Sequence, residues 1–268
     1  MKFLRGRWPR AAGITSAVLI GTALLTPGVA QAAAPDYVAL GDSYAAGQGG
    51  GTYLDTCAHT AAAYPLAVDE LRGVRLKDDQ SCTGATSRDL VQKQIPWTKR
   101  NLKKAELVTI TVGINDLLSE RVTAYCDPEA VDESRHAAKE CWKAIKHAIH
   151  GVGYWLYKGL KKIDHLNDDV KILVTGYPRF FSSPDGRFQH VVNAAADKLN
   201  KTLRHTVDKA QDHGIHVKFV KVAGLFAGHL IDDPFPWIHA DGPDVFHPTA
   251  DGHGAYAHLV TEKVLRLF

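Results

Sequence analysis

Apolar residues recur along this chain with two different periods, and the two kinds of segment alternate. Short apolar runs occupy residues 37–40, 107–112, 170–175 and 216–222, and a shorter one lies near 74–76. Runs of this length that are rich in β-branched residues predict strands. The 216–222 run alternates polar and apolar residues, so we expect it to lie nearer an edge of the sheet.

Between these runs, apolar residues recur at three- and four-residue spacing over 145–163, 192–210 and 256–267. This spacing predicts three amphipathic helices. Because strands alternate with helices, we expect an α/β fold, a three-layer α/β/α sandwich around a parallel five-stranded sheet. Ligands of such sheets bind beyond the carboxyl ends of the strands. The chemically active residues should gather at these strand ends, which we call the carboxyl edge of the sheet.

The first 32 residues are typical of an export signal. Four basic residues between positions 2 and 10 precede an apolar run that ends near residue 25, and small residues stand at 30 and 32. We expect a signal peptide removed after Ala32, a single domain over 33–268 and a secreted, extracellular protein. A membrane anchor is the alternative, but the run is short and lacks flanking stop-transfer charges.

Removal of this leader changes the charge balance. The complete chain has 32 Lys and Arg against 29 Asp and Glu, a formal charge of +3. The leader holds four of the basic residues and no acidic one, which leaves 28 against 29, a net charge of −1. Such a balance implies no basic face for nucleic acid or for an anionic membrane.

The four cysteines, Cys57, Cys82, Cys126 and Cys141, are expected to form two disulfides, because the count is even and the chain is exported. Three pairings are possible. We favour Cys57 with Cys82 and Cys126 with Cys141, because each bridge then stays within one connecting segment. A metal site is the alternative, but no C-x-x-C occurs and His59 is a lone candidate.

A serine follows the first predicted strand directly, in the segment 41–44 (GDSY). Gly41 permits a sharp turn, which would lift Ser43 toward the ligand edge. The segment is not the G-x-S-x-G elbow, since Ala45 stands at the position of the second glycine. An ordinary turn with a capping Ser or Asp is the alternative.

A serine nucleophile needs a base, and residues 244–248 (DVFHP) offer one just before the last helix. Asp244 can curl back onto Nδ1 of His247, leaving Nε2 for the serine. A polar surface loop is the alternative for this segment taken alone. His253, with Asp241 or Asp251, is the substitute pair.

Two further turns offer donors for the oxyanion that forms when a nucleophile attacks an ester carbonyl. The Gly84 N–H lies in 82–86 (CTGAT), and the Asn115 side-chain amide lies in 113–116 (GIND), after a predicted strand. The Ser43 N–H would be a third donor. Each segment alone is more typical of a plain turn, but the combination predicts acyl transfer through a serine.

These four blocks, in this order, resemble the SGNH hydrolases, also called GDSL lipases and esterases. Ser43, Gly84, Asn115 and His247 match the four residues of the family name, and Tyr44 stands where GDSL has leucine. The resemblance is strongest to secreted actinobacterial lipases and phospholipases, which share the YVALGDSY opening and paired cysteines. Some of those carry three disulfides, whereas this chain has cysteines for two.

The resemblance implies a flavodoxin-like SGNH hydrolase fold with no metal and no organic cofactor. It makes Ser43 the nucleophile, His247 the general acid and base, and Asp244 the residue that orients the histidine. In some relatives a backbone carbonyl replaces that aspartate. The Ser43 N–H, the Gly84 N–H and the Asn115 side chain would form the oxyanion hole.

Apolar loops after the later strands suit an acyl chain, although packing in the core is the alternative for most of their residues. Residues 177–181 and 224–239 supply the candidate substrate-binding side chains, Phe180, Phe181, Phe226 and Trp237. We therefore expect a lipase or phospholipase-type esterase acting on a lipid or another ester, with rate rising through about pH 6–8 as His247 loses its proton.

The expected partners follow from this reading. We expect interfacial contact with lipid without stable membrane insertion, no nucleic-acid partner, and a monomer. A carbohydrate O-acetyl esterase is the alternative within the family. A secreted binding protein without activity is the alternative outside enzymes, and the intact four-block set disfavours it.

Overall fold

The structure is a computed structural model that describes residues 34–71 and 73–267. The predicted signal peptide lies outside the described residues. Five parallel strands form one sheet in the order β2-β1-β3-β4-β5. Their bounds are β1 (Asp36–Gly41), β2 (Arg75–Asp79), β3 (Leu107–Thr111), β4 (Lys171–Thr175) and β5 (Val217–Val220). The α/β fold class is confirmed, and β5 is an edge strand as expected.

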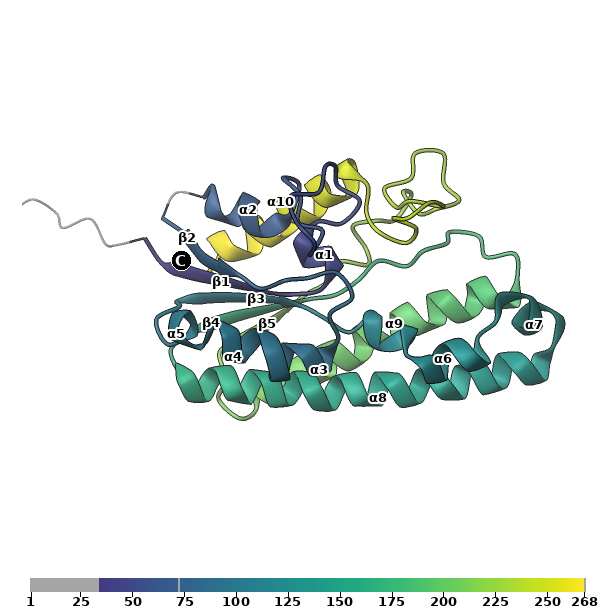
Figure 1. Ribbon diagram of the computed structural model, residues 1–268, viewed down its shortest axis with the longest axis horizontal. Helices are drawn as coiled ribbons and strands as arrows, with labels where there is room; N and C mark the ends of the chain where they lie inside the picture. Colours follow the sequence, from purple (N-terminus) through teal and green to yellow (C-terminus); the bar gives the residue numbers. More distant parts are fainter. Residues whose placement is uncertain (1–33, 72, 268) are drawn as a thin grey trace, which may run out of the picture. The chain divides into compact units, whose positions relative to one another are not determined.

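Helices cover both faces of the sheet (Figure 1). On one face lie α2 (Tyr64–Asp69) and α10 (Ala250–Leu265). On the other lie α8 (Arg135–Leu166) and α9 (Arg187–Gln211). Their apolar stripes face the core, as the spacing predicted. Within the described residues, no helix is long and apolar enough to span a membrane.

Helix α8 begins at Arg135, well before the predicted apolar stripe at 145. Its first turns pack against two short helices, α6 (Glu120–Tyr125) and α7 (Pro128–Glu133). Ser134 caps this earlier start, since its side chain accepts a hydrogen bond from the Ala137 N–H. Tertiary packing therefore extends the helix beyond the segment that periodicity marked.

Several short elements complete the layer that contains α8. A run of helical turns, α3 (Ser87–Asp89), η1 (Leu90–Gln94), α4 (Ile95–Trp97) and α5 (Lys99–Leu102), leads from the loop after β2 toward β3. The single turn η2 (Asn115–Leu118) follows β3. The short helix α1 (Ser43–Ala46) follows β1 directly and precedes α2.

A chain of buried hydroxyl groups ties the layer of α2 and α10 to the sheet. The Thr111 hydroxyl lies 2.9 Å from the Tyr64 hydroxyl and 2.6 Å from that of Thr175. The Tyr256 hydroxyl donates to Thr175 at 2.6 Å. These hydroxyls satisfy one another away from water, so the threonines of two central strands carry no unpaired polar group.

Both disulfides form in the favoured local pairing. Cys57 bonds to Cys82, and Cys126 bonds to Cys141. The first ties the segment after α1 to the loop that contains Gly84. The second ties the end of α6 to the first half of α8.

Removal of the Cys126–Cys141 bridge should lower the free energy of unfolding. The bridge spans a sequence separation of 15 residues, and a loop of that size loses about 3 kcal/mol of stabilisation when opened. Cys126→Ala with Cys141→Ala should show this loss in urea denaturation. Reduction of the wild type at neutral pH is the control, and an unchanged denaturation midpoint in the double variant would contradict the expectation.

Candidate functional site

Ser43 lies at the carboxyl end of β1, on the tight turn into α1. Gly41 allows this turn, because its φ is +148° and a Cβ there would lie 2.4 Å from the backbone oxygen of Thr111. Asp42 caps α1 by accepting a hydrogen bond from the Tyr44 N–H at 3.0 Å. Burial raises the pKa of Asp42 to about 7, against the lowering effect of its hydrogen bond from the Tyr177 hydroxyl.

His247 reaches Ser43 from the other end of the chain. Its Nε2 lies 2.8 Å from the Ser43 Oγ, although the two residues are 204 positions apart. Its Nδ1 lies 3.2 Å from the backbone oxygen of Val245. Burial lowers the pKa of His247 below its usual 6.5, so the ring is neutral at neutral pH. A neutral imidazole in this position can accept the serine proton.

The prediction that Asp244 orients His247 is wrong. The Asp244 carboxylate instead accepts hydrogen bonds from the Gln48 side-chain amide, at 3.2 Å, and from the Tyr53 hydroxyl. The reason is the local turn, in which the His247 N–H donates to the Asp244 backbone oxygen at 2.9 Å. This turn brings a backbone carbonyl to Nδ1 and directs the Asp244 side chain toward another loop.

Phe246, which precedes the histidine, adopts a left-handed backbone conformation with φ of +67°. This conformation costs a residue with a side chain about 1 kcal/mol or more. Three contacts hold it. The Tyr44 hydroxyl donates to the Phe246 oxygen at 2.6 Å, and the rings of Phe180 and Phe181 pack edge-on against its ring. The strained residue therefore directly precedes His247 and helps to direct its ring toward the serine.

Gln48 connects the loops that meet at this site, and sequence reasoning missed it. Its side-chain oxygen accepts from the Thr83 hydroxyl at 2.6 Å, and its side-chain amide donates to Asp244. Its backbone N–H donates to the Ser43 oxygen at 3.0 Å. The serine turn, the Gly84 loop and the histidine loop are thus joined through one residue.

His253, the substitute base, does not face the serine. It is 1 % exposed, and its Nε2 lies 2.8 Å from the backbone oxygen of Gln48. Burial lowers the pKa of His253 to about 4. It holds the Gln48 backbone in place. The alternative pair of His253 with Asp241 or Asp251 is therefore not supported by the geometry.

The two oxyanion-donor segments are fastened to each other. The Asn115 side-chain amide donates to the Ala85 backbone oxygen at 3.0 Å, which leaves its second amide hydrogen for a ligand. The Ser87 N–H and hydroxyl both donate to the Asp116 carboxylate, at 2.8 and 2.6 Å. These bonds hold the Gly84 and Asn115 turns side by side.

Gly84 is exposed and has a φ of +77°, so its backbone conformation, rather than crowding, requires glycine. Among the described residues, neither the Gly84 N–H nor the Ser43 N–H donates a hydrogen bond to protein. Two backbone donors and one amide hydrogen therefore remain for a ligand in the turns that follow the neighbouring strands β2, β1 and β3. Such a set can bind the oxygen of a tetrahedral intermediate.

A second Ser–His–Asp arrangement occurs nearby, and its charge state is different. Nδ1 of His59 lies 2.7 Å from Asp55, and Nε2 lies 3.2 Å from the Ser81 hydroxyl. Hydrogen bonding to Asp79, together with Asp55, raises the pKa of His59 to about 9. A protonated imidazole cannot accept the serine proton, and Ser81 already donates to Asp79 at 2.6 Å. This arrangement therefore fastens the loop beside Cys57.

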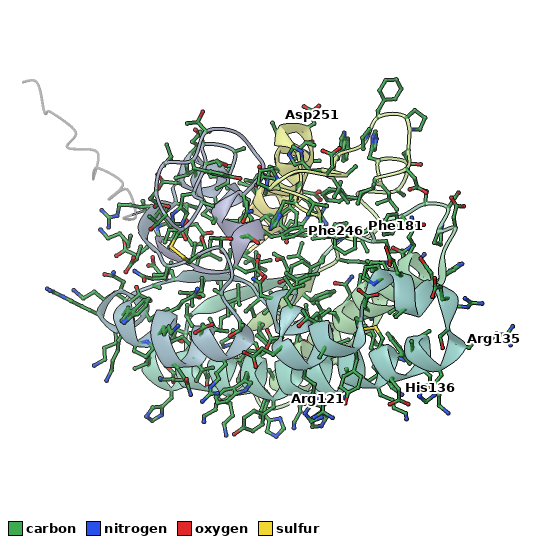
Figure 2. The ribbon with its side chains drawn as sticks, turned by 45° about the vertical axis from the view of Figure 1, so that its right-hand side comes forward. Arg121, Arg135, His136, Phe181, Phe246 and Asp251 are labelled. Carbon is green, nitrogen blue, oxygen red and sulfur yellow. A yellow bond between two sulfur atoms is a disulfide. The ribbon has the colours of Figure 1, made fainter. Side chains whose placement is uncertain are left out.

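Only part of the predicted acyl-binding set is accessible. Phe226 is 0 % exposed and Phe180 is 4 % exposed, so both pack in the core and their prediction as substrate contacts is wrong. Phe181 and Trp237 are partly exposed. Trp237 stacks on His229 at 3.7 Å between ring centroids. Phe181 packs against the ring of Phe246, the residue before His247, and both labelled side chains lie in the same region of the molecule (Figure 2).

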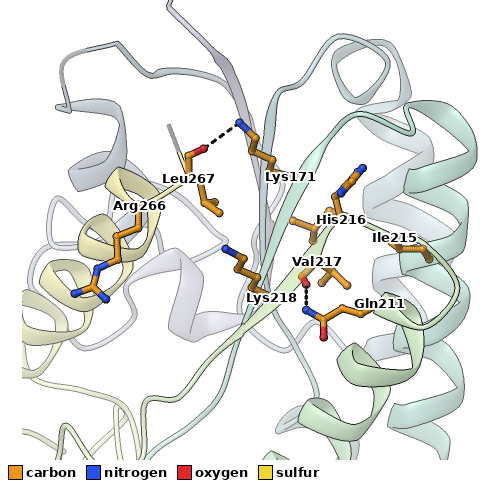
Figure 3. A pocket seen from close by; sticks show the side chains of 9 residues that line it. Lys171, Gln211, Ile215, His216, Val217, Lys218, Arg266 and Leu267 are labelled. Carbon is orange, nitrogen blue, oxygen red and sulfur yellow. Dashed lines mark hydrogen bonds between the residues drawn. The ribbon is translucent and has the colours of Figure 1, made fainter.

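A cavity of about 360 Å³ lies away from this site, at the amino ends of β4 and β5 (Figure 3). Lys171 donates to the Leu267 backbone oxygen across it, at 3.1 Å. Because the strands are parallel, this cavity and Ser43 lie at opposite edges of the sheet. Within the part of the chain that the structure describes, no group of three or more His, Cys, Asp and Glu could hold a metal ion.

Comparison with known proteins gives a consistent set of relatives. Residues 39–255 match the sequence model of the GDSL-like Lipase/Acylhydrolase family. A lipase of Streptomyces rimosus is 32 % identical over 266 residues, which cover 92 % of this chain and 95 % of that protein. The crystal structure of the extracellular lipase from the same organism has a TM-score of 0.69, covering 85 % of this chain and 99 % of that one.

Two other solved structures mark the range of the likeness. Phospholipase A1 from Streptomyces albidoflavus NA297 is 28 % identical with a TM-score of 0.69, over 86 % of this chain and all (100 %) of that chain. A family 3 carbohydrate esterase from Clostridium thermocellum is 16 % identical with a TM-score of 0.55, over 87 % of this chain and 98 % of that chain. The second likeness is one of fold alone.

Asp244→Asn should change the pKa of His247 only slightly, because the carboxylate does not contact the ring. We expect a decrease of less than about half a unit, whereas loss of a directly bonded carboxylate would shift the pKa by about 1–3 units. An NMR titration of the His247 ring protons in both proteins measures the difference. A decrease of more than one unit would restore Asp244 as the orienting group.

Proposed function

The chain belongs to the GDSL-like Lipase/Acylhydrolase family, and we propose that it is a secreted lipase or phospholipase-type esterase that works through an acyl-enzyme on Ser43. It is an ester hydrolase, as its relatives are. The observation that carries the proposed site is the 2.8 Å contact between the Ser43 Oγ and the His247 Nε2. The free donors beside it supply the other half of the chemistry.

In the first step the Ser43 Oγ attacks the ester carbonyl while His247 takes the serine proton at Nε2. The Val245 carbonyl accepts from Nδ1–H, which fixes the tautomer and stabilises the imidazolium. The Ser43 N–H, the Gly84 N–H and the Asn115 amide donate to the oxyanion. Each such donor contributes about 3 kcal/mol of barrier lowering.

His247 then gives its proton to the leaving alcohol, and an acyl group remains on Ser43. Water attacks this acyl-enzyme while His247 takes a proton from the water, and His247 then gives that proton to the leaving Ser43 Oγ as the carboxylic acid is released. No aspartate is required in this cycle, because a backbone carbonyl performs the orienting role. Nδ1 of His247 thus faces a neutral carbonyl, and not a carboxylate.

A lipid ester is the substrate class best supported. The lipase and phospholipase A1 relatives are about 30 % identical over most of their length. The carbohydrate esterase likeness is limited to the fold. Phe181 and the ring of Phe246 offer apolar surface beside the histidine, which suits an acyl chain better than a sugar. A carbohydrate O-acetyl esterase is therefore the second choice.

Export is supported by two observations. The lipase from Streptomyces rimosus is described as extracellular. Both pairs of cysteines in this chain form disulfides, which persist in oxidising compartments. We therefore propose that the leader predicted at 1–32 directs secretion.

Ser43→Ala should abolish labelling by a fluorophosphonate probe and lower kcat by at least about 1000-fold, because the acyl-enzyme cannot form. Ser81→Ala is the matched control, since Ser81 also faces a histidine but one that is charged. The Ser81→Ala variant should still be labelled by the probe.

A series of p-nitrophenyl esters should show preference for medium or long acyl chains, and strict preference for acetate would favour the carbohydrate esterase.

The dependence of kcat/KM on pH should have its acid limb centred below pH 6.5. The protonated histidine cannot act as base, and burial lowers the pKa of His247, so the active form persists to lower pH. The window of pH 6–8 expected for an ordinary histidine therefore moves down. Hydrolysis of a soluble p-nitrophenyl ester between pH 4 and 9 measures the midpoint, and a value above 7 would contradict the assignment.

A further inference from the structure

The outer face of the layer that contains α8 concentrates positive charge. The segment 87–104 has six basic residues and one acidic residue, and α8 has seven basic and two acidic. All thirteen of these basic side chains are exposed. They leave 15 basic against 26 acidic residues on the remainder of 33–268. The absence of a basic face, expected from the near-neutral net charge, is therefore wrong, because that charge is strongly segregated.

The basic residues of α8 lie along one stripe on its solvent side. Exposed residues recur every three or four positions along its solvent side and are basic, histidine or tyrosine throughout. They are Arg135, Lys139, Lys143, Lys146, His150, Tyr154, Lys158, Lys161 and His165. At 1.5 Å per residue the stripe is about 45 Å long. Arg135 and His136 project from its first turn (Figure 2).

The segment 87–104 adds a second basic row beside the carboxyl-terminal half of α8. Arg88 lies over the Trp155 ring at 5.7 Å, and the Lys162 Nζ donates to the Val91 oxygen at 3.1 Å. Asn167, just after α8, donates to the Leu102 oxygen at 3.2 Å. The two rows therefore lie side by side and form a broad surface rather than a single line of charges.

Most of this charge is not neutralised by the protein. Within residues 34–71 and 73–267, ion pairs engage only two of the thirteen cations, Lys93 with Asp89 and Lys143 with Glu140. A helix face that serves only for solubility usually interleaves both signs. Like charges at i and i+4 lower helix stability by a few tenths of a kcal/mol per pair. A single-sign stripe of this length is thus a cost that an anionic partner would offset.

Exposed aromatic rings accompany the cations. Tyr154 is 57 % exposed within the stripe, and Trp97 is 68 % exposed within the second row. Tyrosine and tryptophan beside lysine and arginine are typical of surfaces that lie at the headgroup level of a bilayer. A linear polyanion would be expected to follow a groove, whereas these rows form the outside of a helix layer.

We propose that this face, the α8 stripe with the 87–104 row, docks the enzyme on bilayers that contain anionic phospholipid. The choice of lipid, rather than another anionic surface, as the partner rests on the proposed function. Docking itself requires no catalysis. Helix α8 runs from the carboxyl edge of the sheet to its amino edge, because β3 precedes it and the parallel β4 follows it. The Arg135 end of the stripe therefore lies toward the edge that carries Ser43.

The test uses the mature protein with Ser43→Ala, so that vesicles are not hydrolysed. Sedimentation measures binding to vesicles of phosphatidylcholine with phosphatidylglycerol and to vesicles of phosphatidylcholine alone. The stripe variant carries Lys→Gln at Lys139, Lys146, Lys158 and Lys161. The matched control carries Lys→Gln at Lys77, Lys218, Lys221 and Lys263, which are not part of this face. The two variants change the net charge of the protein equally. Gln has a helix propensity similar to that of Lys, so the substitutions in α8 should not unfold the helix.

Each lysine near an anionic bilayer contributes roughly fivefold to partitioning, so the stripe variant should bind anionic vesicles at least about 100-fold more weakly, and the control variant less than about threefold. Binding by the Ser43→Ala protein with all its lysines intact should fall as salt rises and be absent on phosphatidylcholine alone. Equal losses in the two variants, unchanged binding by the stripe variant, or binding to heparin or duplex DNA without binding to vesicles would overturn the proposal.

Hydrolysis of a soluble p-nitrophenyl ester separates this proposal from the proposed function. In proteins that retain Ser43, the stripe variant should hydrolyse the soluble ester as the wild type does. If the wild type hydrolyses no ester, the proposed function fails while the binding result still stands. The salt dependence of binding by the Ser43→Ala protein provides a measurement that does not depend on the folding of the lysine variants.

Discussion

The contact between the Ser43 hydroxyl and the His247 ring sets the constraint on which the rest of the site depends. It joins two residues 204 positions apart at 2.8 Å, so the first strand and the loop before the last helix must be fixed together. Tyr44 bonds the strained Phe246, Gln48 and Tyr53 hold Asp244, and His239 contacts Gly49. Each of these bonds holds the same two segments together, which keeps the histidine within reach of the serine.

Burial and neighbouring carboxylates give the histidines of this small region different charge states. His247 is buried without a carboxylate and has a lowered pKa, whereas His59 contacts Asp55 and Asp79 and has a pKa raised to about 9. His253 is buried deeper still and only holds a backbone oxygen. Of the two histidines that contact a serine hydroxyl, His247 and His59, His247 is the neutral one. Charge state, rather than the presence of a serine and a histidine, therefore distinguishes the site from the arrangement beside the disulfide.

We propose separate functions for two parts of the molecular surface. The carboxyl edge of the sheet gathers neutral donors and one neutral base. The outer face of the α8 layer gathers cations that net charge conceals. Because the proposed catalytic residues and these cations lie on different elements, either set can be altered without the other.

The sequence alone determined the layered α/β fold, because strand and helix periodicities alternate and parallel strands must be joined by crossovers. It also marked Ser43, Gly84, Asn115 and His247, since each lies in a turn at the end of a predicted strand or before the last helix. It could not decide the partner of His247, because residue spacing does not say whether the Asp244 side chain or the Val245 carbonyl turns toward Nδ1. It could not separate buried Phe226 from accessible Phe181, nor reveal the basic face. Those outcomes depend on which side chains packing covers and on which segments it brings side by side, and only the tertiary structure decides that.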